Sequence, residues 1–169
     1  MRRDFVFQSS LKNVWKGNTQ PQATNEIYNE SNTKLEDGSL VYSEEMRSRN
    51  NDQILNSINS YLDGNIYSLK NFNGLAPKSI DEFKLLIRDI RSVGVDVEFI
   101  LIPYPPTVFD VIQKDYSSVL QVETFINQFA NELNIKVKGS YNPFIYNLKN
   151  IDFYDGMHLK GEGIKKILN

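Results

Sequence analysis

Apolar residues between positions 79 and 102 change from a helical spacing to an almost unbroken run. Ser79–Glu82 (SIDE) matches a capping box, in which the Ser and Glu side chains satisfy free backbone N–H groups at a helix start. Gly94 stands where a left-handed C-terminal cap is expected, and the stripe between the two signals consists of Phe83, Leu86, Ile87 and Ile90. Val95–Ile102 (VDVEFILI) then runs into Pro103. The pattern predicts a helix that leads into a central parallel strand, buried between helices on both faces.

The same periodicities predict further elements on both sides of this unit. We expect short strands at Leu40–Tyr42, Asn65–Leu69 and Ile135–Val137, and helices at Glu44–Leu62, Thr107–Lys114, Val119–Leu133 and Ile164–Leu168. Residues 17–39 are rich in Asn, Thr, Gln, Glu and Ser, which predicts a long polar loop. Alternating helices and buried strands favour an α/β fold, a three-layer sandwich around a mainly parallel sheet.

Composition narrows the possible functions. The 169 residues suit a single domain over 1–169, and a net charge of -2 without basic clusters argues against nucleic acid as a partner. With no cysteine, one histidine and no phosphate-cradling glycine loop, we expect neither a metal site nor a cofactor. No apolar run reaches the length of a signal-peptide core or of a membrane span, so we expect no membrane segment in this chain.

The only histidine, His158, lies three residues after Asp155 on a turn marked by Gly156. In serine-type hydrolases an imidazole takes the proton from the nucleophile, while a carboxylate on its other nitrogen fixes the tautomer. Asp and His three residues apart on an irregular turn can make that contact locally. The alternative is an ordinary Asp-Gly turn followed by an exposed histidine. The position after the last predicted strand favours a catalytic pair.

The segment Asp155-Gly156-Met157-His158, followed by Gly163 and a short helix, resembles the last sequence block of the SGNH (GDSL-type) hydrolases. The run GSYNP at 139–143 followed by DFYDGMH is similar to proteins of bacterial surface-polysaccharide biosynthesis and acylation. The resemblance covers roughly residues 75–169. It implies a flavodoxin-like three-layer fold and ester chemistry on acylated carbohydrate, with Asp155 and His158 as the catalytic pair.

The first block of that family, Gly-Asp-Ser after the first strand, is not matched. Its nearest counterpart is FQSSL at 7–11, where Ser10 would be the nucleophile and Gln8-Ser9 replace Gly-Asp. A strained nucleophile turn needs small, permissive residues, so Ser10 as the cap of a helix beginning at Leu11 is the alternative that we favour. Either the chain is the C-terminal part of a longer protein whose nucleophile and membrane anchor lie upstream, or it is a complete small domain with a degenerate site. An upstream anchor would imply an extracytoplasmic location, and the chain itself indicates no compartment.

Substrate-binding candidates are less specific. Tyr104 lies just past the central predicted strand, and Tyr141 begins an aromatic stretch with Phe144 and Tyr146 that would form a sugar-stacking wall or only fix the loop. Asn73, with Asn71, and Gly38 or Gly64 are candidates for an oxyanion hole, although such residues form turns by default.

Two functions follow from these residues. The first is an esterase or O-acyltransferase domain acting on a carbohydrate or other acyl-ester substrate, provided that a nucleophile is supplied. The second is a catalytically inert module of the same fold that binds glycan or a protein partner.

Overall fold

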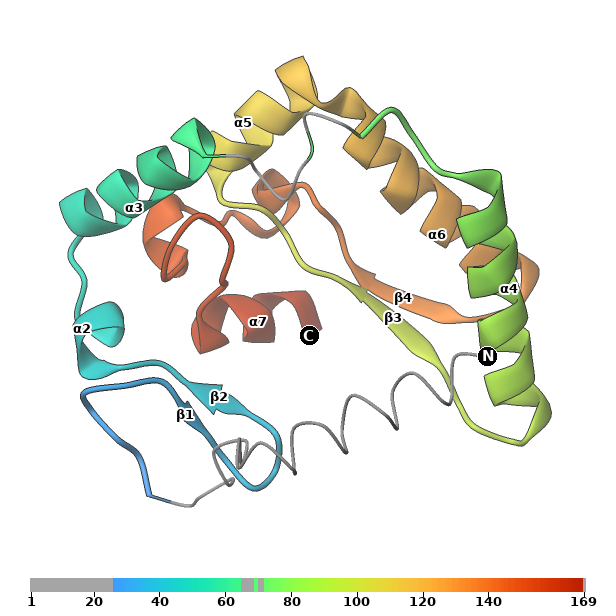
Figure 1. Ribbon diagram of the computed structural model, residues 1–169, viewed down its shortest axis with the longest axis horizontal. Helices are drawn as coiled ribbons and strands as arrows, with labels where there is room; N and C mark the ends of the chain where they lie inside the picture. Colours follow the sequence, from blue (N-terminus) through green and yellow to red (C-terminus); the bar gives the residue numbers. More distant parts are fainter. Residues whose placement is uncertain (1–25, 65–68, 70–71, 169) are drawn as a thin grey trace, which may run out of the picture. The chain divides into compact units, whose positions relative to one another are not determined.

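The computed structural model describes residues 26–64, 69 and 72–168, and the chain divides into two compact units, Met1–Ser48 and Arg49–Asn169 (Figure 1). That residues 1–169 form a single domain therefore stays a prediction. In the described part of the first unit, strand β1 (Thr33–Lys34) pairs antiparallel with β2 (Leu40–Val41), and the short helix α2 (Glu44–Arg47) follows.

The β1–β2 hairpin corrects the polar loop expected over residues 17–39, of which residues 26–39 are described. Thr33 and Lys34 form a strand, and the rest of this described part is irregular as predicted. The turn depends on Asp37-Gly38: the Asp37 carboxylate accepts hydrogen bonds from the Ser39 backbone N–H (2.8 Å) and hydroxyl (2.6 Å), and Gly38 adopts a φ of 86°. An Asp-Gly pair is a strong hairpin signal.

The helix predicted at Glu44–Leu62 is in fact two helices, α2 and α3 (Asn51–Asp63). Asn50 causes the break because it caps α3: its side chain accepts from the Gln53 N–H, and the Gln53 side chain accepts from the Asn50 N–H. The strand expected at Asn65–Leu69 lies outside the described residues except for Leu69.

The second unit contains the remaining elements. In chain order these are α3, α4 (Pro77–Ser92), β3 (Glu98–Leu101), α5 (Pro106–Asp115), α6 (Leu120–Glu132), β4 (Lys136–Gly139) and α7 (Gly161–Leu168), with single 3-10 turns at Ser117–Val119, Pro143–Tyr146 and Asn150–Asp152. The helix predictions at Thr107–Lys114, Val119–Leu133 and Ile164–Leu168 are therefore confirmed to within a few residues. The α/β class is also confirmed.

Helix α4 begins earlier than its sequence pattern suggested. Pro77 occupies the first turn and no side chain caps the helix, so Ser79 lies inside α4 and the predicted capping box is wrong. The C-terminal signal is confirmed, since Gly94 has a φ of 83°. Along the predicted stripe Ile87 is buried, whereas Leu86 is 55% exposed.

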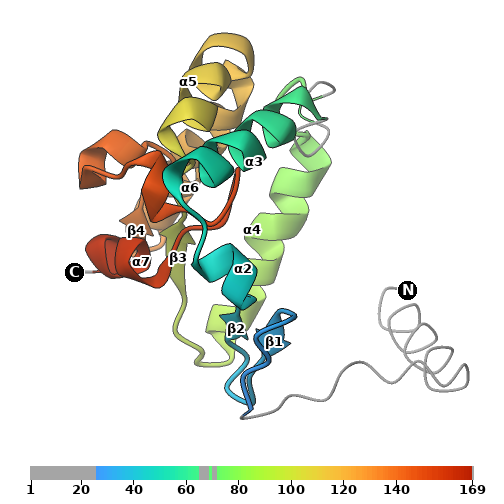
Figure 2. The same cartoon turned by 90° about the vertical axis from the view of Figure 1, so that its left-hand side faces the viewer.

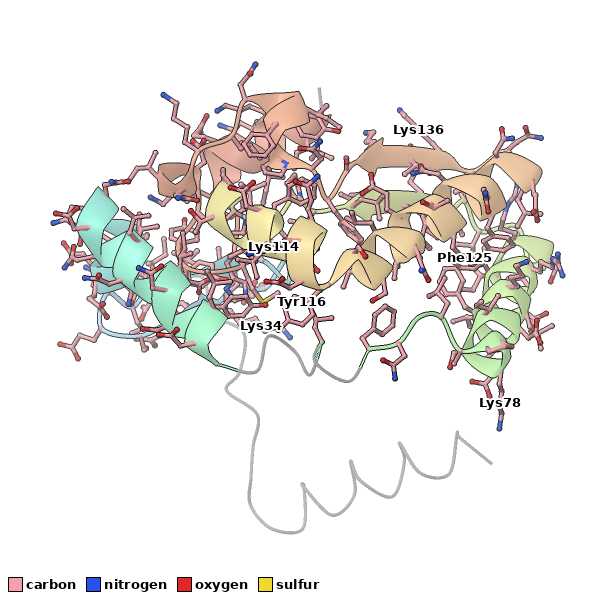
Figure 3. The ribbon with its side chains drawn as sticks, turned by 90° about the horizontal axis from the view of Figure 1, so that it is seen from above. Lys34, Lys78, Lys114, Tyr116, Phe125 and Lys136 are labelled. Carbon is pink, nitrogen blue, oxygen red and sulfur yellow. The ribbon has the colours of Figure 1, made fainter. Side chains whose placement is uncertain are left out.

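Strands β3 and β4 pair in parallel, with Glu98 opposite Lys136 and Leu101 opposite Gly139, and they lie side by side in Figure 1. One face of the pair packs on α4 and α6 through an apolar cluster, which includes Phe83, Ile87, Phe99, Phe129 and Val137. Figure 3 shows Phe125 of α6 directed towards α4, and its ring centroid lies 6.0 Å from that of Phe83. These contacts place an aromatic cluster of the second unit between two helices and a sheet.

The other face of this sheet is partly exposed, so the prediction of a strand buried on both sides is wrong. Ile100 is 48% exposed and Ile102 is 42% exposed, and β3 pairs only with β4 among the described residues. Burial along β3 therefore alternates, although its apolar sequence does not. An apolar run of this kind shows that a strand could be buried on both faces, but the number of neighbouring elements decides whether it is.

A second apolar cluster lies where α3 and α5 pack together (Figure 2). Its fully buried members are Ile54, Ile58, Val108 and Ile112. The segment that follows β4 is held by a third cluster, which joins α7 to the 3-10 turns and consists of Leu148, Phe153, Leu159 and Ile167. Phe153 and Leu159 of this third cluster flank the turn that carries Asp155 and His158.

Candidate active site

The turn between Phe153 and Leu159 is closed by backbone contacts. Phe153 and Leu159 form an isolated antiparallel bridge, and the Tyr154 N–H donates to the His158 carbonyl over 2.8 Å. Both bridge residues are buried, at 0% and 7% exposure, in the cluster beside α7. The apolar ends fix the turn to the protein, while the polar residues between them project from it.

Asp155 organises this turn. Its Oδ1 atom accepts hydrogen bonds from the backbone N–H groups of Met157 and His158, both over 2.9 Å. The carboxylate also contacts Nδ1 of His158, at 3.0 Å from Oδ1 and 2.8 Å from Oδ2. The predicted contact between the Asp155 carboxylate and Nδ1 is therefore confirmed, and the catalytic role of the pair stays a prediction.

The environment of Asp155 favours the ionised carboxylate. Burial by itself raises the pKa of Asp155, but the hydrogen bonds from the His158 ring and from the two backbone N–H groups outweigh burial, so the pKa lies below its usual value. An ionised carboxylate can only accept hydrogen bonds. The neutral His158 ring must therefore carry its proton on Nδ1, and a nucleophile would be deprotonated at Nε2.

Tyr104 and Tyr141 lie at the carboxyl ends of β3 and β4, and the structure brings them together. Their rings meet edge to face with centroids 5.5 Å apart, and the Tyr104 N–H donates to the Tyr141 carbonyl over 3.1 Å. Burial and then the nearby Glu123 charge raise the pKa of Tyr141, so its phenol stays protonated near neutral pH. Both rings also pack on the cluster between α3 and α5, which supports the loop-fixing role without testing a sugar contact.

The remaining predicted residues are not joined to the pair. Asn73 lies in the irregular segment before α4, and within the described ranges it makes no hydrogen bond with Asp155 or His158. Gly38 forms the β1–β2 turn and Gly64 ends α3, which are the turn roles that such residues adopt by default. Ser10 and Asn71 lie outside the described residues.

An apolar hollow of about 230 Å³ opens between α4 and α6. Its walls are formed mainly by Leu75, Ile80, Phe83, Val122, Phe125 and Ile126. None of the predicted site residues lines it, so this hollow and the Asp155–His158 turn are separate features of the second unit.

Three residues near the turn that carries Asp155 and His158 were missed by the sequence analysis. Arg49 donates from Nη1 to the Tyr154 carbonyl (3.4 Å) and to the Ser57 hydroxyl (3.2 Å), and the Tyr61 ring lies against Gly156. No motif connects these residues with a turn about a hundred positions later.

Within residues 26–64, 69 and 72–168, no cluster of His, Asp and Glu is arranged to hold a metal ion.

Comparison with known proteins adds no family assignment. No family model, curated protein or solved structure matches the chain. In the part of the chain that the structure describes, no helix combines the length and the apolar character needed to cross a membrane.

Proposed function

We propose that this chain carries the acid–base pair of an SGNH-type esterase or O-acyltransferase that acts on acylated carbohydrate. The observation that carries the proposal is the contact of 2.8 Å between the Asp155 carboxylate and Nδ1 of the only histidine. The sequence resemblance of the DGMH segment supplies the reaction class, and that of GSYNP at 139–143 followed by DFYDGMH supplies the carbohydrate substrate.

In the proposed reaction, Nε2 of His158 takes the proton of a serine hydroxyl while the serine oxygen attacks the ester carbonyl. The imidazolium, stabilised by Asp155, returns this proton to the departing sugar alkoxide, which leaves an acyl-enzyme. The acyl-enzyme is then attacked by water, which gives hydrolysis, or by a second sugar hydroxyl, which gives acyl transfer. Both reactions follow the same steps in reverse order.

The finer fold assignment belongs to the same proposal. We infer that β3 and β4 are part of a larger, mainly parallel sheet in a three-layer, flavodoxin-like sandwich. Parallel sheets are normally covered on both faces, and a single parallel pair with half-exposed Ile100 and Ile102 is unusual. With additional parallel strands beside β3, the Asp155–His158 pair would lie at the carboxyl edge of a full sheet, where ligands bind in such folds.

The second function, an inert module that binds glycan or a protein partner, is favoured by Gln8-Ser9, which stand where the family has Gly-Asp before its serine. The two functions share the substrate, so binding is tested first. The full chain, labelled with nitrogen-15 histidine, is titrated with an O-acetylated oligosaccharide and with its deacetylated form. Because His158 is the only histidine, its ring resonances report binding at the pair directly.

We expect saturable shifts with the acetylated sugar and smaller shifts, or none, with the deacetylated one. Equal shifts with both sugars would support glycan binding without ester recognition. No shift with either sugar would rule out a carbohydrate ester as the ligand of this site.

A further inference from the structure

The turn that carries Asp155 and His158 rests on helix α3. Arg49, one residue before the α3 N-cap, contacts the Tyr154 carbonyl at one end of the turn. Tyr61, in the last turn of α3, packs against Gly156 in its middle. The two contacts therefore come from α3 and from the residue just before its N-cap, about a hundred positions from the turn in sequence.

The contact between Tyr61 and Gly156 leaves no room for a side chain. A Cβ atom placed on Gly156 would lie 2.4 Å from Cγ, 2.5 Å from Cβ and 2.6 Å from Cδ1 of Tyr61. Separations below about 3 Å between such atoms are strongly repulsive, because interiors are packed near van der Waals contact. The Tyr61 ring thus lies directly on the Gly156 backbone.

The ring has little freedom to retreat. Tyr61 packs against the cluster between α3 and α5, and Ile54 and Ile58, which are both fully buried, hold α3 in that cluster. Gly156 joins Asp155 to Met157, whose N–H is one of the donors to the Asp155 carboxylate. A shift of the Gly156 backbone would therefore change the geometry of the Asp155–His158 contact at once.

We propose that Tyr61 is a positioning residue for the Asp155–His158 pair, and that α3 sets the tautomer of His158 through Tyr61 and Gly156. The inference rests on the proposed function, because the tautomer matters only if Nε2 is to act as a base. Asp155 can hold the proton on Nδ1 only while the turn keeps the carboxylate beside that nitrogen.

The experiment measures the ring nitrogen-15 shifts of His158 in the full chain at a pH where the ring is neutral. The two ring nitrogens have different shifts in the two tautomers, and a single histidine removes any assignment ambiguity. The Asp155→Ala variant supplies the reference for a ring without its carboxylate. We expect the Nδ1–H form to dominate in the wild type and in Tyr61→Phe, which keeps the ring.

In Tyr61→Ala and Gly156→Ala we expect the shifts to move towards those of the Asp155→Ala reference. The matched control is Tyr116→Ala, because Tyr116 packs on the same cluster as Tyr61. The control should keep the wild-type tautomer, although it too loses an aromatic ring. Equal movement in Tyr116→Ala and Tyr61→Ala would overturn the proposal in favour of general loosening.

Retention of the wild-type tautomer in folded Tyr61→Ala or Gly156→Ala would also overturn the proposal. If Tyr61→Ala fails to fold, Gly156→Ala and the milder Tyr61→Leu decide between the same outcomes. Failure of the proposed function is distinguishable. If Asp155→Ala itself leaves the wild-type tautomer unchanged, the pair is not formed and the proposed function fails. If Asp155→Ala changes the tautomer but the Tyr61 variants do not, only the positioning role of Tyr61 is refuted.

Discussion

Replacing Asp155 by alanine removes the acceptor for two backbone N–H groups and for the His158 ring. A net hydrogen bond in a protein is worth about 1 kcal/mol, and somewhat more when the acceptor is charged. The His158 side chain is half exposed, so its hydrogen bond contributes a free energy at the low end of this range. We therefore expect Asp155→Ala to lower the free energy of unfolding of the second unit by about 2–3 kcal/mol at neutral pH.

The matched variant, Asp155→Asn, keeps a carbonyl oxygen for the backbone N–H groups but loses the charge. We expect it to cost only about 1 kcal/mol. The assay is urea unfolding of the full chain followed by far-UV circular dichroism, with each variant measured across a series of pH values.

The pH dependence has a defined sign. The pKa of Asp155 is lower in the folded protein than in the unfolded chain, so the folded state binds fewer protons at this group in acid. The carboxylate's contribution is fully present above the unfolded pKa, about 3.9 for aspartate, and is lost as the pH falls through the folded pKa. The stability difference between the wild type and Asp155→Asn should therefore shrink below about pH 4. Equal unfolding midpoints at neutral pH for wild type and Asp155→Ala, or a difference that stays constant into strong acid, would refute the reasoning.

Two further predictions concern activity and packing. We expect the isolated chain to hydrolyse p-nitrophenyl acetate no faster than His158→Ala; turnover that requires His158 and is lost in Ser10→Ala would instead make Ser10 the nucleophile. We expect Gly139→Ala to cost about 2–4 kcal/mol in urea unfolding, since strained backbone and overpacking each cost about 1–3 kcal/mol. Gly139 has a φ of 85°, and a Cβ there would lie 2.0 Å from the Leu101 carbonyl oxygen. Gly161→Ala is the control, because apart from its chain neighbours and the backbone of its own helix nothing lies within 4 Å of the added Cβ. Equal unfolding midpoints for the two variants would contradict the packing argument.

Several features of this protein were determined by short stretches of its sequence. The contact between Asp155 and His158 spans three residues of a turn, and the groups that form it are all local, so the DGMH segment was enough to predict it. The left-handed cap at Gly94 and the amphipathic helix α6 are local in the same way. Each depends on backbone conformation or periodicity within a few turns.

Other features were decided only by tertiary structure. The contacts of Arg49 and Tyr61 with the Asp155–His158 turn join residues about a hundred positions apart, and no local pattern encodes such contacts. The exposure of Ile100 was also decided by tertiary structure, because burial of a strand face depends on which elements pack against it. The sequence by itself thus determined the contact between Asp155 and His158. Which helix supports this pair was decided by the packing of α3 against the core, since long-range contacts form only when the whole chain is folded.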